Sequence, residues 1–162
     1  MPLTPFHLGP ALALGLPLRR KLHVPTLILS SIACDVEPLL VLAFNLDYPL
    51  HGYLHTLIAA TLLGVAIGTI MKSLEPSLKP LYDPIRLEDR KPSLSHFLAA
   101  GVLGTTSHVL LDAPLYSDIK PLYPLQANPF YNPSATLGVY SFCLLSGLLG
   151  LAYYIRLLTT RK

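Results

Sequence analysis

The sequence predicts an all-α integral membrane protein, a helical bundle of about five helices that forms a single domain over residues 1–162. Hydrophobic residues make up 52% of the chain and charged residues only 13%, whereas soluble domains carry about 25% charged residues. Four apolar stretches are long enough to cross a bilayer, which takes about 20 residues. These four clear spans cover residues 25–46, 54–71, 94–112 and 137–158.

A shorter apolar stretch at residues 3–18 predicts the fifth helix. It contains Gly9, Pro10 and Pro17, and the basic residues 19–21 follow it. A signal peptide carries its positive charge before the apolar run, so we expect residues 3–18 to be retained as a first helix. The sequence leaves open whether this helix spans the bilayer fully.

The second stretch, residues 25–46, is interrupted by the acidic motif "DVEP". A carboxylate at the centre of a membrane helix costs about 2.5–3.5 kcal/mol and usually marks a functional site. Pro38 removes a backbone donor and disfavours helical geometry in the residue before it. We therefore expect a break here that turns Asp35 and Glu37 toward a polar cavity.

Histidine-containing motifs flank the third and fourth stretches. "HGYLHT" begins the third stretch with His51 and His55, and "HVLLD" ends the fourth with His108 and Asp112. On a helix, a four-residue spacing places both side chains of each pair on one face. Because successive spans run in opposite directions, both pairs are expected in the same half of the bundle, together with His7.

The basic residues predict on which side of the membrane this half lies. Positive residues collect in the cytoplasmic connections of membrane proteins. All of the basic residues except Lys120 fall between the first and second stretches, between the third and fourth, or after the last. They are Arg19, Arg20, Lys21, Lys72, Lys79, Arg86, Arg90, Lys91, Arg156, Arg161 and Lys162. This pattern predicts an outer N-terminus, an inner C-terminus and a polar cluster toward the outer side, and it explains the net charge of +3 without nucleic-acid binding.

The grouped side chains predict a metal centre. Mixed nitrogen and oxygen ligation suits zinc first, with manganese or iron as alternatives, and the ligand number fits one ion, or two ions about 3.5–4 Å apart. The expected metal ligands are His7, Asp35, His51, His55, His108 and Asp112, and the expected catalytic residues are Glu37 and Asp35. Glu37 is expected as a further ligand, as a general base or as a group that orients a ligand histidine. Such a centre activates water for hydrolysis and stabilises charge on a phosphoryl or carbonyl oxygen.

Two other interpretations fit part of this pattern. In a membrane transporter or sensor, the same cluster would bind and pass a divalent metal ion or protons, and a chain this short would need to form an oligomer. Against this interpretation, we expect no matching chain of polar groups in the inner halves of the helices. We separately expect His23 to be solvated in the basic connection. A bis-histidine haem site explains the histidines but not the carboxylates.

The connection at 113–136 is rich in proline and tyrosine and nearly free of charge. Tyrosine favours the membrane–water interface, which predicts an interfacial girdle. The alternative is a lid over the metal centre, because the connection directly follows Asp112. In that case Tyr116, Asp118 and Tyr123 are the candidates for substrate contact.

The motifs "TPFHLGPAL", "DVEP", "HGYLHT" and "HVLLDAPLY" resemble, in that order, those of the membrane-bound metal-dependent hydrolases, which are small bacterial and archaeal inner-membrane proteins. The resemblance covers about residues 4–130 and matches the six expected metal ligands to the family's histidines and acids. Cys34 and Gly52 depart from it, since many relatives carry proline and arginine there. A more remote resemblance to zinc-dependent phospholipases C implies phosphoester hydrolysis, and the membrane setting implies a lipid or lipid-linked substrate.

Overall fold

The computed structural model describes residues 5–87 and 92–160, which form helices and loops and no strand. The helices are α1 (Pro5–Gly15), α2 (Val24–Ala33), α3 (Val36–Phe44), α4 (Leu57–Tyr82), α5 (Leu94–Asp112) and α6 (Thr136–Thr159), with 3-10 turns η1 (Tyr53–His55) and η2 (Pro133–Ala135). Four segments are long and apolar enough to cross a membrane: Val24–Phe44, Leu57–Tyr82, Leu94–Asp112 and Pro133–Thr159. The predicted all-α membrane bundle is confirmed. Of the basic residues used above, Arg90, Lys91, Arg161 and Lys162 lie outside the described ranges.

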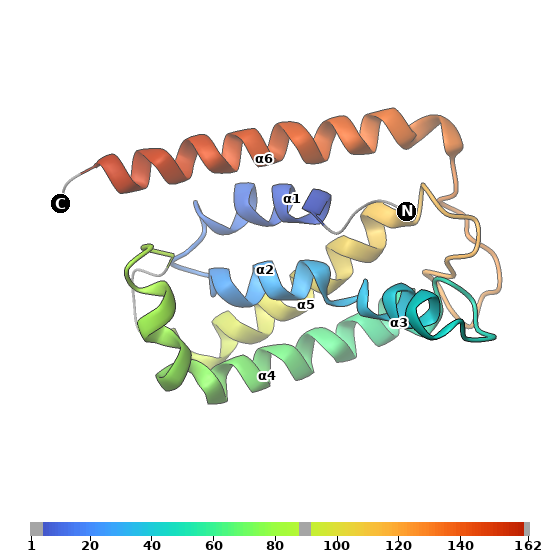
Figure 1. Cartoon of the computed structure of the whole chain (residues 1–162), viewed down its shortest axis with the longest axis horizontal. Helices are drawn as coiled ribbons and strands as arrows, with labels where there is room; N and C mark the ends of the chain where they lie inside the picture. The colour runs from blue at the N-terminus through green and yellow to red at the C-terminus, as the bar shows by residue number, and fades with distance from the viewer. Residues whose placement is uncertain (1–4, 88–91, 161–162) are drawn as a thin grey trace.

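The helices pack in successive layers (Figure 1). Helix α6 covers α1, α1 contacts α2, and α2 rests on α5, which pairs with α4. The α1–α2 and α4–α5 connections lie at one end of the bundle, while α3 and the connection before α6 lie at the other. With 11 residues, α1 is about 16 Å long and covers only about half of a 30 Å hydrocarbon core.

Glycines allow the closest helix contacts. A Cβ atom built on Gly101 of α5 would lie 2.1 Å from the carbonyl oxygen of Gly64 in α4. A Cβ on Gly9 of α1 would lie 2.1 Å from the carbonyl oxygen of Cys143 in α6. These backbones therefore touch directly, as small residues permit between membrane helices, and the contacts fix where α1 and α5 hold their polar side chains.

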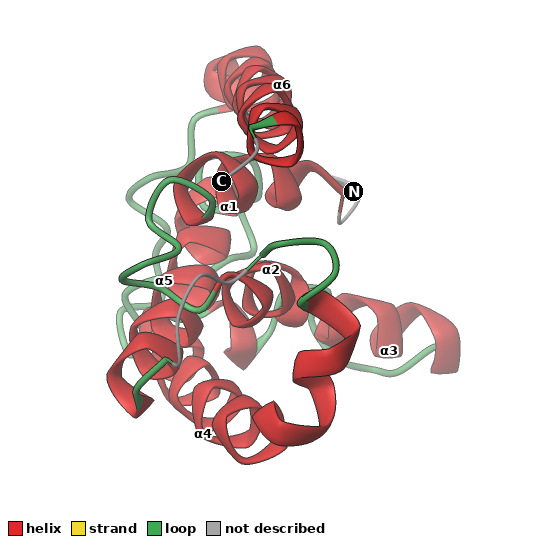
Figure 2. Cartoon of the chain, turned by 90° about the vertical axis from the view of Figure 1, so that its left-hand side faces the viewer, coloured by secondary structure: helices red, strands yellow, loops and turns green. Residues whose placement is uncertain are grey.

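The predicted break in the second stretch is confirmed. Helix α2 ends at Ala33, Asp35 precedes α3, and Pro38 lies in the first turn of α3, where its missing N–H is tolerated. Helix α3 turns out of the bundle, as Figure 2 shows. The break leaves Asp35 and Glu37 beside the ends of α1, α4 and α5 rather than in the middle of a continuous helix.

The boundaries of α4 differ from the prediction at both ends. The helix continues past residue 71 to Tyr82, with Pro76 and Pro80 inside it, and its last turns bend in Figure 1. The predicted span ended where polar residues begin, but polar residues do not end a helix, and the prolines only bend it.

At the N-terminal end of α4, "HGYLHT" is not α-helical: Thr56 caps α4 by accepting a hydrogen bond from Ala59 N over 3.1 Å. The helical spacing expected for His51 and His55 is therefore wrong.

His23 is buried rather than solvated. Its side chain is 0% exposed and caps α2 by accepting a hydrogen bond from Thr26 N over 3.3 Å. Its Nε2 lies 3.2 Å from the hydroxyl of Tyr82 and 3.2 Å from Oε2 of Glu75. Burial, with the charge of Lys72 nearby, lowers the pKa of His23 to about 4. The imidazole is therefore neutral near pH 7 and belongs to the packed interior.

Buried polar residues also follow α2 between the two ends of the bundle. Thr26 and Ser30 are 0% exposed and Ser31 is 2% exposed. With His23 and Glu75, they form a series of buried polar groups along α2, from the opposite end of the bundle to Ser31, whose carbonyl oxygen contacts His108. Buried polar groups therefore do occur toward that end of the bundle, which weakens the argument from the inner halves of the helices against a transporter.

Candidate metal centre

The six expected metal ligands converge at one end of the bundle. His7, Asp35, His108 and Asp112 each offer a donor atom within 4.8 Å of the others. His51, His55 and Asp112 form a second such group. These side chains come from α1, the α2–α3 break, the segment before α4, and the end of α5. Their role as ligands stays a prediction, but the fold gives them the proximity that the role requires.

Asp112 is common to both groups and lies between the histidines. Its Oδ1 lies 3.2 Å from His7 Nε2, and its Oδ2 lies 3.4 Å from His108 Nε2. His108 Nε2 also lies 3.7 Å from Oδ1 of Asp35. The rings of His7 and His108 stack with their centroids 3.9 Å apart. Asp112 is also a member of the group with His51 and His55, so its carboxylate is placed to take part in both groups of potential ligands.

Three of the histidines are oriented through their Nδ1 atoms. His55 Nδ1 lies 3.0 Å from Glu37 Oε2, His51 Nδ1 lies 3.0 Å from Asp118, and His108 Nδ1 lies 2.8 Å from the carbonyl oxygen of Ser31. A neutral imidazole that donates from Nδ1 has an unprotonated Nε2. This is the arrangement by which carboxylates and carbonyls fix metal-ligating histidines.

The central donor atoms fit a divalent cation. Nε2 of His55, Nε2 of His108 and both carboxylate oxygens of Asp112 are buried and make no well-aligned hydrogen bond to the residues that the structure describes. Burying one such group without a partner costs about 1–3 kcal/mol. Imidazole nitrogens and carboxylate oxygens are ligands of zinc, manganese and iron. A divalent ion would therefore bind atoms that the packing alone leaves without a well-aligned hydrogen bond.

Glu37 holds the segment that carries His51 and His55. Besides the contact with His55, it accepts hydrogen bonds from Gly52 N at 2.9 Å, Leu54 N at 3.2 Å and the hydroxyl of Tyr48 at 3.2 Å. These bonds explain why "HGYLHT" folds as an irregular segment with η1 rather than as a helix. Even so, the ring centroids of His51 and His55 lie only 4.8 Å apart. Of the three roles considered for Glu37, this geometry favours orienting a ligand histidine.

The connection at 113–136 lies over the histidines. The ring of Tyr116 lies 4.3 Å from that of His51, and the ring of Tyr123 lies 5.5 Å from that of Tyr53. Leu57 N donates to the carbonyl oxygen of Pro121 over 2.9 Å and ties the connection to the start of α4. Burial, together with nearby His55, lowers the pKa of His51, although Asp118 acts in the opposite direction. The contacts favour the lid over a simple interfacial girdle.

A profile of the YdjM inner membrane protein family matches residues 2–161. The chain belongs to the YdjM inner membrane protein family. It is therefore an inner-membrane protein, and its apolar helices agree with a position in the lipid bilayer. No curated protein and no solved structure gives a significant match. The name of the YdjM family states where the protein lies and names no reaction or ligand.

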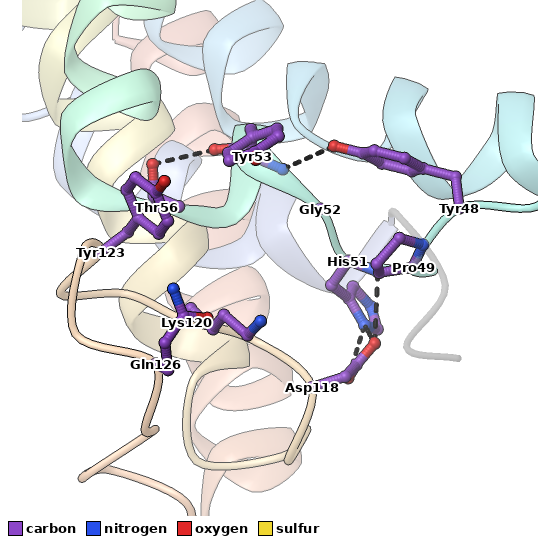
Figure 3. A pocket seen from close by; sticks show the side chains of 10 residues that line it. All are labelled: Tyr48, Pro49, His51, Gly52, Tyr53, Thr56, Asp118, Lys120, Tyr123 and Gln126. Atoms are coloured by element: carbon purple, nitrogen blue, oxygen red, sulfur yellow. Dashed lines mark hydrogen bonds and ion pairs between the residues drawn. The ribbon is translucent and has the colours of Figure 1, made fainter.

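A polar cavity of about 210 Å³ opens beside His51 in this member of the YdjM family (Figure 3). Its walls include residues that sequence reasoning did not assign to the site, namely Tyr48, Tyr53, Lys120 and Gln126. For Lys120 the sequence did hold a signal, because it is the basic residue that departs from the charge pattern of the other connections. For Tyr48, Tyr53 and Gln126 the sequence held no such signal, since the cavity forms only where the 113–136 connection folds back over the segment before α4.

Proposed function

We propose that this protein is a membrane-embedded metal-dependent hydrolase that cleaves phosphoester bonds in lipid or lipid-linked substrates. The observation that carries the proposal is the position of Asp112, which is shared by two buried groups of potential ligands. Resemblance to the membrane-bound metal-dependent hydrolases and, more remotely, to zinc-dependent phospholipases C supports this bond type. The positive-inside pattern supports a site toward the outer membrane face.

The residues divide into two binding groups. His7, Asp35 and His108 would hold one ion and His51 and His55 the other, with Asp112 between them. Zinc suits this donor set best, with manganese or iron as alternatives. Bound divalent ions polarise a phosphoryl oxygen and lower the pKa of water.

The protein's own contribution is orientation, exclusion of water and proton transfer. Glu37 and Asp118 fix His55 and His51 through their Nδ1 atoms, and the 113–136 connection covers the centre. In hydrolysis the oxygen of water bonds to phosphorus, the ester P–O bond breaks, and the alcohol leaves with a proton. Asp35 is our candidate to accept the proton of the attacking water at a carboxylate oxygen, because it lies at the α2–α3 break beside His108. Glu37, engaged by four donors, acts mainly through His55.

Elemental analysis of the detergent-solubilised protein tests this proposal. We expect about one or two equivalents of zinc, manganese or iron, and loss of metal in the folded double variant His51→Ala/His108→Ala. Release of phosphate or a phosphorylated headgroup from phospholipids should stop on chelation and return with the metal. A folded protein that neither contains metal nor takes it up on reconstitution would contradict the proposal.

A second candidate function is passage of protons or metal ions across the membrane. The buried series His23, Thr26, Ser30 and Ser31 on or beside α2 favours it, because it continues from the metal centre toward the other end of the bundle. The test is flux into sealed vesicles that contain the protein. Flux that falls in Ser30→Ala but not in Ser95→Ala, an exposed serine of α5, would support transport. Turnover without flux would support the hydrolase alone.

A further inference from the structure

The polar cavity beside His51 is placed to receive the reacting end of a substrate. His51 belongs to the second group of potential ligands and also lines this cavity. The Gly52–Tyr53 segment forms one wall, and the 113–136 connection supplies Asp118, Lys120 and Gln126 (Figure 3). Whatever fills the cavity therefore lies next to the metal centre.

Lys120 gives the cavity a positive charge. The other described basic residues belong to the α1–α2 and α4–α5 connections, to the second half of α4 or to the end of α6, and these two connections lie at the opposite end of the bundle (Figure 1). The carbonyl oxygen of Lys120 accepts a hydrogen bond from Tyr123 N, but its ammonium group makes no hydrogen bond or ion pair with any residue that the structure describes. The neighbouring carboxylate of Asp118 is already engaged by Nδ1 of His51 at 3.0 Å and by His51 N at 3.2 Å. An anionic group in this cavity would thus find an uncommitted ammonium group.

An apolar groove of about 340 Å³ lies on the other side of Tyr48. Leu40 and Val41 of α3, with Leu46 and Leu54, line it, and Tyr48 lines both the groove and the polar cavity. The Tyr48 hydroxyl accepts from Tyr53 N at 3.0 Å and donates to Glu37 at 3.2 Å, so its ring is held as a fixed partition. The two spaces are therefore neighbours, and charged and hydroxyl groups lie in the walls of the first, whereas leucine and valine side chains form most of the second.

Helix α3 presents this groove to the lipid phase. It turns away from the bundle in Figure 2, and its outward side chains are apolar. Leu39 is 55% exposed, Leu42 55% and Phe44 69%. In a protein of the inner membrane, such a face lies against acyl chains. A hydrocarbon chain can enter the groove laterally, while its polar end reaches the cavity.

We propose that the cavity and the groove together bind one phosphate-bearing amphiphile, with its anionic headgroup beside Lys120 and its hydrocarbon chain along α3. This inference rests on the proposed function, and it adds where the headgroup and the hydrocarbon chain of a lipid substrate bind. A ligand with one polar and one hydrocarbon end fits the two spaces on either side of Tyr48, and the ammonium group of Lys120 favours an anionic head.

Equilibrium binding to the full-length protein in a neutral maltoside detergent tests this inference. The probes are dodecylphosphonate, which has no ester bond to hydrolyse, dodecanol, and propylphosphonate. We expect dodecylphosphonate to bind most tightly and Lys120→Gln to weaken its binding by about tenfold or more, as loss of a charge-assisted contact does. Lys21→Gln, at the exposed opposite end, is the matched control and should bind normally.

A second pair of variants tests the groove. Leu40→Ser should weaken the binding of dodecylphosphonate, whereas Leu39→Ser should not, because Leu39 is exposed on the same helix but does not line the groove. Propylphosphonate binding as tightly as dodecylphosphonate would overturn the inference in favour of a water-soluble phosphate ester. Dodecanol binding equally well, or Lys120→Gln binding normally, would overturn the role of the cavity.

The same probes separate this inference from the proposed function. Metal content and phospholipid turnover that persist while Lys120→Gln and Leu40→Ser bind dodecylphosphonate normally would overturn the inference alone. Selective binding of dodecylphosphonate by a protein without metal or turnover would support the inference as a binding site and contradict hydrolysis.

Discussion

Oδ1 of Asp112, at the end of α5, lies 3.2 Å from Nε2 of His7, near the start of α1. The two residues are brought together because α1 and α5 both pack on α2. Asp112 also faces His108, so one carboxylate contacts histidines from separate helices. If this carboxylate is the shared ligand of two ions, its removal should affect both.

Substitution of the shared carboxylate should remove more metal than substitution of an unshared one. Asp112 belongs to both ligand groups and Asp35 to one. We expect Asp112→Asn to lose both ions and Asp35→Asn to keep about one of two, as measured by elemental analysis after gel filtration. Asp47→Asn, in an exposed loop, serves as the control. Equal metal content in the two variants would contradict a shared role for Asp112.

Glu37→Gln should weaken metal binding without abolishing it. The amide retains the size of the side chain but accepts less strongly from His55 Nδ1 and the backbone N–H groups of Gly52 and Leu54. Loss of an outer partner of a metal-ligating histidine typically costs 10- to 100-fold in affinity, and we expect about this loss in a competition titration with a chelator. Turnover lost at full metal occupancy and unchanged affinity would instead assign Glu37 as the general base.

The stability of the protein should rise with pH between about 4 and 6.5 because of His23. Burial lowers its pKa to about 4 in the folded protein, from the ordinary histidine value of 6.5. Between these values the unfolded chain binds more protons than the folded one, so unfolding becomes harder as pH rises. The shift corresponds to at most about 3 kcal/mol at neutral pH.

Thermal unfolding in detergent across this pH range measures the effect. His23→Asn keeps a side chain that can cap α2 but does not titrate. The difference in stability between the two proteins should therefore depend on pH, since other titrating groups contribute equally to both. A constant difference would show that His23 does not contribute to the pH dependence.

Gly101→Ala should destabilise the bundle. The added Cβ would lie 2.1 Å from the carbonyl oxygen of Gly64, so α4 and α5 must move apart. Overpacking of this kind costs about 1–3 kcal/mol and lowers the melting temperature. Gly138→Ala is the control, because a Cβ there would meet nothing within 4 Å. An unchanged melting temperature for Gly101→Ala would mean that the two helices are less tightly packed than described.

Local sequence patterns predicted much of this architecture. The span at residues 94–112 coincides with α5, because a long apolar run bounded by polar residues is an adequate signal for a membrane helix. The break between α2 and α3 followed from Pro38 and its acidic neighbours, since proline acts on the backbone next to it. Antiparallel connectivity alone brought the polar ends of α1, α4 and α5 to one end of the bundle.

The sequence by itself therefore determined the apolar spans, the break and the set of converging histidines and acids. Only the tertiary structure decided which side chain faces which: Glu37 holds His55, Asp118 holds His51, and His23 is buried against Glu75. The prediction of helical spacing was wrong for "HGYLHT" because the backbone N–H groups of Gly52 and Leu54 donate to the carboxylate of Glu37 rather than to carbonyl oxygens within a helix. The physical reason is that apolar runs and prolines act over a few neighbouring residues. Hydrogen bonds between side chains form only after packing has brought distant segments within about 3 Å of one another.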